Sequence, residues 1–326
     1  MSERPVALVL RALYLGDLLT GLPALALLRR ALPEHRIVLA APSAVGRLAL
    51  LAGSVDDVVP ARELDPLLGA PTGADVAVDL HGKGPESRDL LAATAPRRLI
   101  AFDYGTVAWR ADEHEVQRWC RLIGTAFAAD LPWPGVAGSL PVPFVAPAER
   151  ARMTVVHPGA KAASRRWPPR RYMEVARALA ADGHEVVVTG GPGEEELAGE
   201  VAKAAGVGLR TGLSLDRLLA LIASARLVIS GDTGVAHIAS AYRTPSVVMF
   251  GPVSPQLWGP PADPRHQALW PAAPDYRGDP HAARTDPVLL QITVTDVLAS
   301  VPQSLAAAAP GNQPVDGTPS SSRRSA

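Results

Sequence analysis

Short apolar runs alternate with helix-like segments along most of the chain, and this alternation constrains the fold more than any other feature. A strand that is buried on both faces reads as a continuous apolar run, and parallel strands need a crossover, usually a helix, between them. In the first half, the apolar runs lie at residues 6–10, 36–40, near 57, 75–80 and 97–101. A helix-like segment, LLTGLPALALLRRAL, fills residues 18–32. The first half is therefore predicted to be an α/β sandwich built on a parallel sheet.

The same pattern restarts in the second half of the 326-residue chain. Its apolar runs are MTVVHPGA, HEVVVTGG, RLVIS and SVVMF, which begin at residues 153, 184, 226 and 246. Helices are predicted at about 169–182, 194–205 and 215–223. The two halves are thus predicted to be two Rossmann-like, doubly wound parallel-sheet domains that face each other across a cleft.

The domain boundary is predicted in a proline-rich segment. Residues 130–150 contain five prolines and show no sustained periodicity, which excludes a long helix. We therefore expect a first domain at 1–130, a linker at 131–150 and a second domain at 151–307. The polar segment 308–326 is rich in Pro, Gly and Ser and is predicted to be disordered.

The composition excludes several classes of protein. With 32 basic and 32 acidic side chains the net charge is zero, which argues against nucleic-acid binding and requires a local cluster for any anion. Cys120 is the only cysteine, so internal disulfides and thiolate metal clusters are excluded and a reducing compartment is favoured. The N-terminal apolar run is too short for a signal peptide, and no stretch of about 18 apolar residues occurs. These features predict a cytoplasmic protein that does not span a membrane.

Reactive side chains follow the predicted strands. Ligands of open α/β sheets bind at the carboxyl ends of the strands. Asp17 comes soon after the first strand, His157 ends MTVVH, Glu194 follows VVVTGGPG and Asp232 follows LVIS. Asp17 lies in the first turn of a predicted helix, where the helix dipole keeps a carboxylate ionised. It is either a proton acceptor or a simple helix cap.

The segment SGDTGVAHIASAYRTPSVVMFGP, residues 230–252, combines a tight turn with polar side chains. The turn at 231–234 is predicted to open a helix, whose free N–H groups favour a phosphate. Thr233 and His237 are four residues apart and share one helix face, so both could reach one anion. The alternative is structural: Asp232 or Thr233 is an N-cap, and His237 is an ordinary helix histidine.

A basic cluster lies in HPGAKAASRRWPPRRY, residues 157–172. Lys161, Arg165 and Arg166 stand between a strand end and a helix whose start is marked by prolines. The cluster could neutralise a diphosphate, although a solvated surface explains any single arginine as well. Glu194 could accept hydrogen bonds from a ribose, or it could merely complement the helix dipole.

Several familiar motifs are absent from the sequence. It contains no G-x-x-x-x-G-K-[ST], no G-x-G-x-x-G after a strand, no H-E-x-x-H and no D-x-D. Any phosphate is therefore expected to be held by arginines and helix dipoles, so neither a metal nor another cofactor is predicted.

Four segments of the sequence together resemble glycosyltransferase family 9, the ADP-heptose-dependent heptosyltransferases, which have the two-domain GT-B fold. The likeness runs through about residues 6–302. The segments that carry it are GDLLTGLPALALLRRALP at 16–33, DVAVDLHGKGPES at 75–87, VVHPGAKAASRRWP at 155–168 and the segment at 230–252 quoted above.

The resemblance implies a role for individual residues. Asp17 corresponds to the proposed general base. Arg166 stands where the family has a lysine that helps to hold the donor phosphates, so the charge is retained but the shape differs. Glu194, or Glu195 in another register, corresponds to the acid that touches the donor ribose. The residues implied to line the donor diphosphate and sugar are Asp232, Thr233, Gly234 and His237.

The resemblance also implies a reaction: metal-independent, inverting transfer of a sugar, a heptose from ADP-heptose, to a glycan or glycolipid hydroxyl in lipopolysaccharide biosynthesis. Lys83, Lys161 and Arg165 are candidates for phosphate or acceptor contacts. A lipid-linked acceptor would bring the protein into peripheral contact with the inner face of a membrane. Two alternatives stay open, a nucleotide-sugar epimerase with the GT-B fold and a non-catalytic nucleotide-sugar-binding protein.

Overall fold

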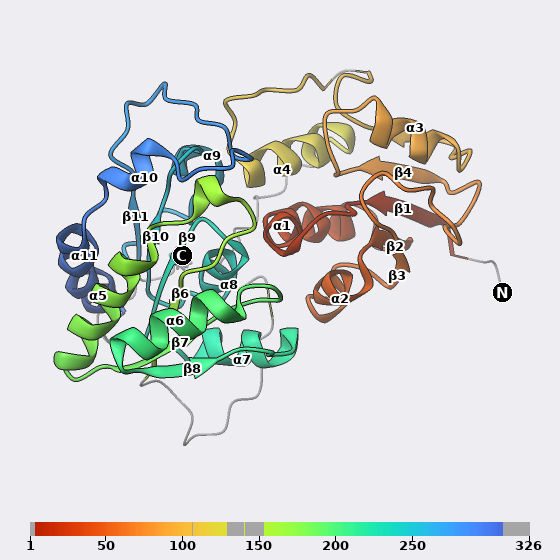
Figure 1. The fold of residues 1–326 in the computed structure, drawn as a ribbon. Coiled ribbons are helices and arrows are strands. Elements are labelled where there is room, and N and C mark those ends of the chain that lie inside the picture. Colours follow the sequence, from red (N-terminus) through yellow and green to blue (C-terminus); the bar gives the residue numbers. More distant parts are fainter. Residues whose placement is uncertain (1–3, 106, 129–139, 141–152, 309–326) are drawn as a thin grey trace, which may run out of the picture.

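Two parallel β-sheets flanked by helices stand side by side in the computed structural model, which describes residues 4–105, 107–128, 140 and 153–308 (Figure 1). The first sheet has the strand order β3-β2-β1-β4-β5. Its strands are β1 (Val6–Leu10), β2 (Arg36–Ala41), β3 (Asp57–Pro60), β4 (Val76–Asp79) and β5 (Leu99–Ile100). Its helices are α1 (Leu15–Ala31), α2 (Ser43–Leu51), α3 (Glu86–Ala92) and α4 (Glu115–Ala126). We call these elements the first lobe.

The second sheet has the order β11-β10-β9-β6-β7-β8, and its paired strands are again parallel. Its strands are β6 (Met153–His157), β7 (Glu185–Thr189), β8 (Gly208–Arg210), β9 (Leu227–Gly231), β10 (Ser246–Met249) and β11 (His266–Leu269). Its helices are α5 (Pro169–Ala181), α6 (Glu195–Ala205), α7 (Leu215–Ser224), α8 (Gly234–Tyr242), α9 (Pro255–Trp258), α10 (Pro287–Gln291) and α11 (Val294–Ala307), with a 3₁₀ turn at Ala163–Arg165. These elements form the second lobe.

The doubly wound α/β architecture predicted from the sequence is confirmed. The two edge strands of the second sheet, β8 and β11, were not predicted, because neither shows a continuous buried apolar run. Residues 131–139 and 141–150 of the predicted linker, and 309–326 of the predicted tail, lie outside the described residues, so both remain predictions.

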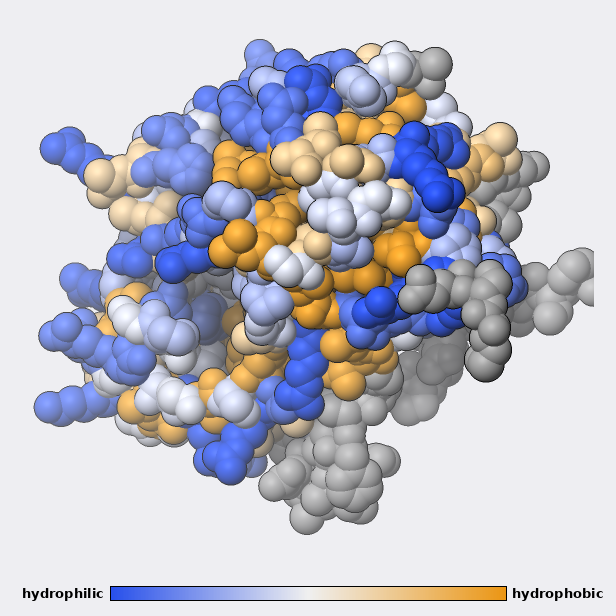
Figure 2. All heavy atoms as spheres, turned by 90° about the vertical axis from the view of Figure 1, so that its right-hand side faces the viewer, coloured by the Kyte–Doolittle hydropathy of each residue, from blue (hydrophilic) through white to orange (hydrophobic). Residues whose placement is uncertain are grey.

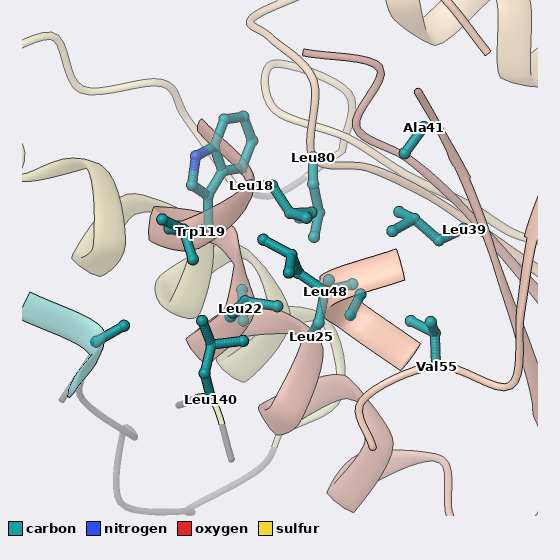
Figure 3. Close-up of a cluster of buried hydrophobic side chains, with 14 of the residues drawn as sticks. Leu18, Leu22, Leu25, Leu39, Ala41, Leu48, Val55, Leu80, Trp119 and Leu140 are labelled. Carbon is teal, nitrogen blue, oxygen red and sulfur yellow. The ribbon is translucent and has the colours of Figure 1, made fainter. Parts of the chain in front are cut away.

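A hydrophobic cluster fills the space between the first sheet and its helices (Figure 3). Leu18, Leu22 and Leu25 on α1 converge there on the indole of Trp119 from α4 and on Leu80 after β4. Each of these side chains is at most 1% exposed. Their burial holds the start of α1 against the end of the sheet, which is where the polar residues of the site begin.

The two lobes pack directly on each other through α1 and α8, which lie between the sheets (Figure 1). A Cβ atom on Gly234 would lie 3.1 Å from Leu15 Cδ2, so the missing side chain permits the close approach of the two helices. The cluster around α1 continues across this contact to residues of the second lobe, among them Val235 and Ile238. An exposed ion pair also joins the two lobes: Arg47 Nη1 lies 2.9 Å from Asp216 Oδ2.

The face of the first lobe that points away from the second lobe carries hydrophobic residues near its middle and hydrophilic ones around them (Figure 2). No helix in the described part of the chain combines the length and the apolar character that a membrane span requires.

Candidate active site

The carboxyl ends of both sheets contain a topological switch point. In the first sheet β1 lies between β2 and β4, and in the second β6 lies between β7 and β9, so successive connections leave toward opposite sides. Such a point leaves space for a ligand at the strand ends. The loops that follow β1, β4, β6 and β9 therefore hold the candidate site.

Asp17 is the third residue of α1 and is half-buried. Its Oδ2 accepts a hydrogen bond of 3.3 Å from the backbone N–H of Tyr14, so the capping interaction that the sequence left open is present. Its other oxygen accepts no hydrogen bond from the described residues. The carboxylate is thus held at one oxygen, and the second is available to a substrate.

His237 on α8 lies next to the start of α1. A Cβ on Gly16 would stand 2.9 Å from His237 Cδ2, so the glycine before Asp17 is what lets the imidazole approach. Burial lowers the pKa of His237, and the carboxylates of Asp232 and Asp17 oppose that shift. His237 is therefore a neutral imidazole near pH 7. The structure brings Asp17 and His237, predicted on opposite lobes, into one region.

Neither Asp232 nor Thr233 caps α8 with a side-chain hydrogen bond, although Thr233 is the N-cap residue by position. The buried Asp232 carboxylate lies 3.4 Å from Arg165 Nη1 and forms an ion pair with it. Thr233 occupies the N-cap position, but its hydroxyl makes no capping hydrogen bond. Ala236 and His237 donate their N–H groups to the Thr233 carbonyl, so the N–H groups of Gly234 and Val235 are the ones left to another acceptor at the start of α8.

Buried polar atoms without a partner gather at the same place. Within the described ranges, the buried side-chain atoms that lack a hydrogen-bond partner are Ser164 Oγ, Arg165 Nε, Ser230 Oγ, Thr233 Oγ1 and His266 Nε2. All except His266 belong to the loop after β6 or to the junction of β9 and α8. A buried polar atom that makes no hydrogen bond is destabilising, so this concentration indicates a ligand or ordered water.

Glu194 precedes α6, and its carboxylate turns back toward the loop after β6. Its Oε2 accepts a 2.8 Å hydrogen bond from the N–H of Gly191 and lies 3.6 Å from His157 Nε2. The side chain makes no capping bond to its own helix. A helix-dipole role alone therefore does not explain its orientation.

The basic residues of the loop after β6 are held differently. Arg166 is exposed, and its Nε donates a 2.8 Å hydrogen bond to the carbonyl of Ala160. Lys161 Nζ lies 3.4 Å from the ring centroid of Tyr14, which connects the two lobes. Lys83 is exposed in the loop after β4, and no described contact joins it to the other predicted site residues.

Sequence reasoning missed Arg11 and His81, two polar residues that follow β1 and β4. Arg11 is fully buried, and its Nε donates a 2.6 Å hydrogen bond to the carbonyl of Asp17. His81 Nδ1 accepts a 3.2 Å hydrogen bond from the N–H of Ala12, so the imidazole proton is on Nε2. The signal that could have found them is the one that found Asp17, a polar residue just after a predicted strand. No group of three or more His, Cys, Asp or Glu side chains suited to a metal occurs in the described part.

The fold defines a two-lobed α/β protein of the GT-B class, with unpartnered polar side-chain atoms near the start of α8 in its second lobe. The family model for glycosyltransferase family 9 (heptosyltransferase) matches residues 91–278, which is more than half of the chain. The chain therefore belongs to glycosyltransferase family 9.

Curated relatives and solved structures agree with this assignment. Lipopolysaccharide heptosyltransferase 3 of Escherichia coli is 34% identical over 166 residues, 48% of either protein. Lipopolysaccharide heptosyltransferase 2 of E. coli strain K12 is 32% identical over 32% of either protein. The chain thus spans about half, or less, of the length of these curated relatives.

Two solved structures resemble the whole fold. A family 9 glycosyltransferase from Veillonella parvula gives a TM-score of 0.75 at 17% identity and covers 93% of this chain and 97% of its own. E. coli heptosyltransferase WaaC with ADP gives 0.72 at 20% identity and covers 92% and 99%. At these identities the likeness establishes the fold.

Proposed function

We propose that the protein is an inverting glycosyltransferase that moves a heptose from ADP-heptose to a hydroxyl of a glycan or glycolipid. The observation that carries the proposal is that Asp17 and Arg165 both lie close enough to His237 to influence its charge, with unpartnered polar atoms of Arg165 and Thr233 at the start of α8. One side can stabilise a departing diphosphate, and the other can take a proton.

The second lobe would bind the diphosphate. Transfer expels a dianionic leaving group, and hydrogen-bond donors that already point at the developing charge stabilise the transition state. The start of α8 supplies backbone N–H groups and the Thr233 hydroxyl, while Arg165 supplies a positive charge. The ion pair with Asp232 fixes the Arg165 guanidinium in place. These groups would take the place of a metal ion, so we propose that none is required.

The first lobe would supply the base. The acceptor hydroxyl must lose a proton as it attacks the anomeric carbon, and a positioned base contributes typically about 10²- to 10⁴-fold to the rate. Asp17 has one carboxylate oxygen engaged by Tyr14 and another available to the acceptor. A single displacement with base and leaving group on opposite sides of the sugar inverts the anomeric configuration.

The names of the relatives support the choice of substrates. The curated relatives act as lipopolysaccharide heptosyltransferases, and WaaC has been solved with ADP and with ADP-2-deoxy-2-fluoro heptose. We therefore propose ADP-heptose as donor and a lipopolysaccharide core sugar as acceptor. A lipid-linked acceptor would bring this proposed cytoplasmic enzyme to the inner face of a membrane.

A steady-state assay of ADP release tests the proposal. We expect turnover only when ADP-heptose and an acceptor are both present, and no loss of activity on adding a chelator. Asp17→Asn should lower kcat by about 10²- to 10⁴-fold, because an amide cannot accept the proton. Asp65→Asn makes the same change on an exposed loop and serves as the control.

The other outcomes separate the alternatives. Conversion of the donor into an epimeric nucleotide sugar without acceptor, seen by product analysis, would indicate an epimerase, and donor binding without turnover would indicate a sensor. Full activity of Asp17→Asn would exclude Asp17 as the base.

A further inference from the structure

A chain of polar side chains links the ends of β6 and β7 to the start of α6. His157 is the last residue of β6, Thr189 is the last residue of β7, and Glu194 precedes α6. His157 Nδ1 lies 3.1 Å from Thr189 Oγ1, and its Nε2 lies 3.6 Å from Glu194 Oε2. His157 and Thr189 are both buried. Neither residue has a role in the transfer reaction described above.

His157 is held between Thr189 and Glu194. A 3.1 Å hydrogen bond joins its Nδ1 to the Thr189 hydroxyl and directs Nε2 toward Glu194 Oε2. Burial lowers the pKa of His157, and the charge of Glu194 opposes that shift, so the carboxylate favours a hydrogen on the nitrogen that faces it. At 3.6 Å this contact is electrostatic and is not a hydrogen bond.

The Glu194 carboxylate is confined on its other sides as well. A Cβ on Gly159 would collide with both oxygens of the Glu194 carboxylate, so only glycine leaves room for the carboxylate there. Gly191 donates its N–H to Oε2 at 2.8 Å. Oε1 accepts no hydrogen bond from any described residue. One oxygen is thus fixed by the protein, and the other is left to a ligand.

We propose that His157, with Thr189 behind it, is a positioning residue that orients the Glu194 carboxylate to accept hydrogen bonds from the ribose hydroxyls of the donor. The inference rests on the proposed function, because it needs a nucleotide in the second lobe. A carboxylate held in one rotamer loses less side-chain entropy on binding, and it discriminates against nucleotides that lack the hydroxyls. His157 thereby contributes to the selection of ribonucleotide donors without touching the donor.

Calorimetric titration with ADP and with 2′,3′-dideoxy-ADP tests this role. The unaltered protein should bind ADP more tightly than the dideoxy analogue. His157→Leu should weaken ADP binding by about tenfold and leave binding of the analogue unchanged, because only the ribose contact is lost. Thr189→Val should do the same to a smaller extent. His157→Gln keeps an N–H donor near the Nε2 position and should restore most of the preference for ADP.

The chain offers a matched control in the same pair of strands. Thr154 Oγ1 lies 2.8 Å from His184 Nδ1 at the amino ends of β6 and β7, and both residues are buried. His184→Leu and Thr154→Val repeat the chemical changes far from Glu194 and should leave the preference for ADP intact. Thermal unfolding of every variant shows whether it folds.

Each result bears on a different part of the proposal. A folded His157→Leu or Thr189→Val variant that keeps the full preference for ADP over the analogue would overturn the role of His157. Equal weakening of both nucleotides would also overturn it, since the effect would not pass through the ribose. If the unaltered protein bound no nucleoside diphosphate, the proposed function itself would fall, and the inference with it.

Discussion

Single residues at the candidate site are constrained by contacts with residues that are distant in the sequence. Glycine occurs at Gly16, Gly159 and Gly234 because a Cβ there would meet His237, Glu194 or Leu15. None of the three has a positive φ, so the constraint is space and not backbone conformation. At these positions the absence of a side chain is what permits the close contacts.

Replacement of Gly159 is a residue-scale test of the Glu194 site. In Gly159→Ala the new methyl group would collide with both carboxylate oxygens of Glu194, so the carboxylate must move. We expect the affinity for ADP to fall about tenfold or more, as measured by calorimetry, with the fold intact. Gly199→Ala on α6 is the control, because the nearest atom to its Cβ is Leu209 Cδ2 at 4.0 Å.

We expect Gly199→Ala to raise the free energy of unfolding, since alanine in a helix interior is more favourable than glycine by about 0.5–1 kcal/mol. An unchanged affinity for ADP in Gly159→Ala would show that the position of the Glu194 carboxylate does not matter for nucleotide binding.

At the scale of elements, the candidate site lies at the ends of the strands, and other polar pairs join neighbouring strands away from it. The pairing of β10 with β11 includes a 2.9 Å hydrogen bond between Ser246 Oγ and His266 Nδ1. His266 Nε2 is buried without a partner. Burial lowers the pKa of His266 from 6.5 to about 4, so the imidazole of His266 is neutral near pH 7.

The His266 pair predicts how stability depends on pH. Below pH 6.5 the unfolded chain binds a proton at His266 that the folded protein does not bind until about pH 4. The free energy of unfolding should therefore be fully retained above pH 6.5 and fall as the pH is lowered toward 4. Buried His157, His184 and His237, whose pKa values are also lowered, add to the same trend.

Denaturant unfolding at several pH values measures this effect. His266→Asn should make the decline between pH 6.5 and 4 shallower by up to about 1.4 kcal/mol per pH unit, the contribution of one proton. Identical slopes in the variant and the unaltered protein would contradict the lowered pKa of His266.

For the whole molecule, the packing of α1 on α8 joins two sheets that the sequence presents as separate domains. The hydrophobic cluster around α1 includes residues from both lobes, so neither lobe buries its apolar surface completely without the other. The exposed ion pair between Arg47 and Asp216 adds little, because such pairs contribute about 0–1 kcal/mol. The apolar contact is therefore what holds the two site halves together.

The shared cluster predicts that both lobes unfold in one cooperative transition. Trp119 and Trp167 are buried in the first and the second lobe. Fluorescence of a Trp119→Phe variant and of a Trp167→Phe variant, which shift the signal toward opposite lobes, should give the same midpoint as circular dichroism within each variant. Two separated transitions would show that the α1–α8 contact does not couple the lobes.

The sequence by itself determined the architecture and most of the candidate site. Buried parallel strands need continuous apolar runs, and ligand-binding residues must follow such strands, so both features are local and readable in one chain. Asp17, Thr233 and His237 were found in this way. Arg11 follows a strand equally directly but was overlooked, because its partners lie at positions that no spacing rule connects to it.

Only the tertiary structure decided which of these residues meet. The contact of Gly16 with His237, the ion pair of Arg165 with Asp232 and the linkage of His157 to Glu194 all join segments separated by other elements. Hydrophobic periodicity shows which face of an element is buried but not against which partner. Whether the side chains of Asp232 and Thr233 cap α8 could be read only from the structure, because the same residue types favour a cap and a ligand-binding group.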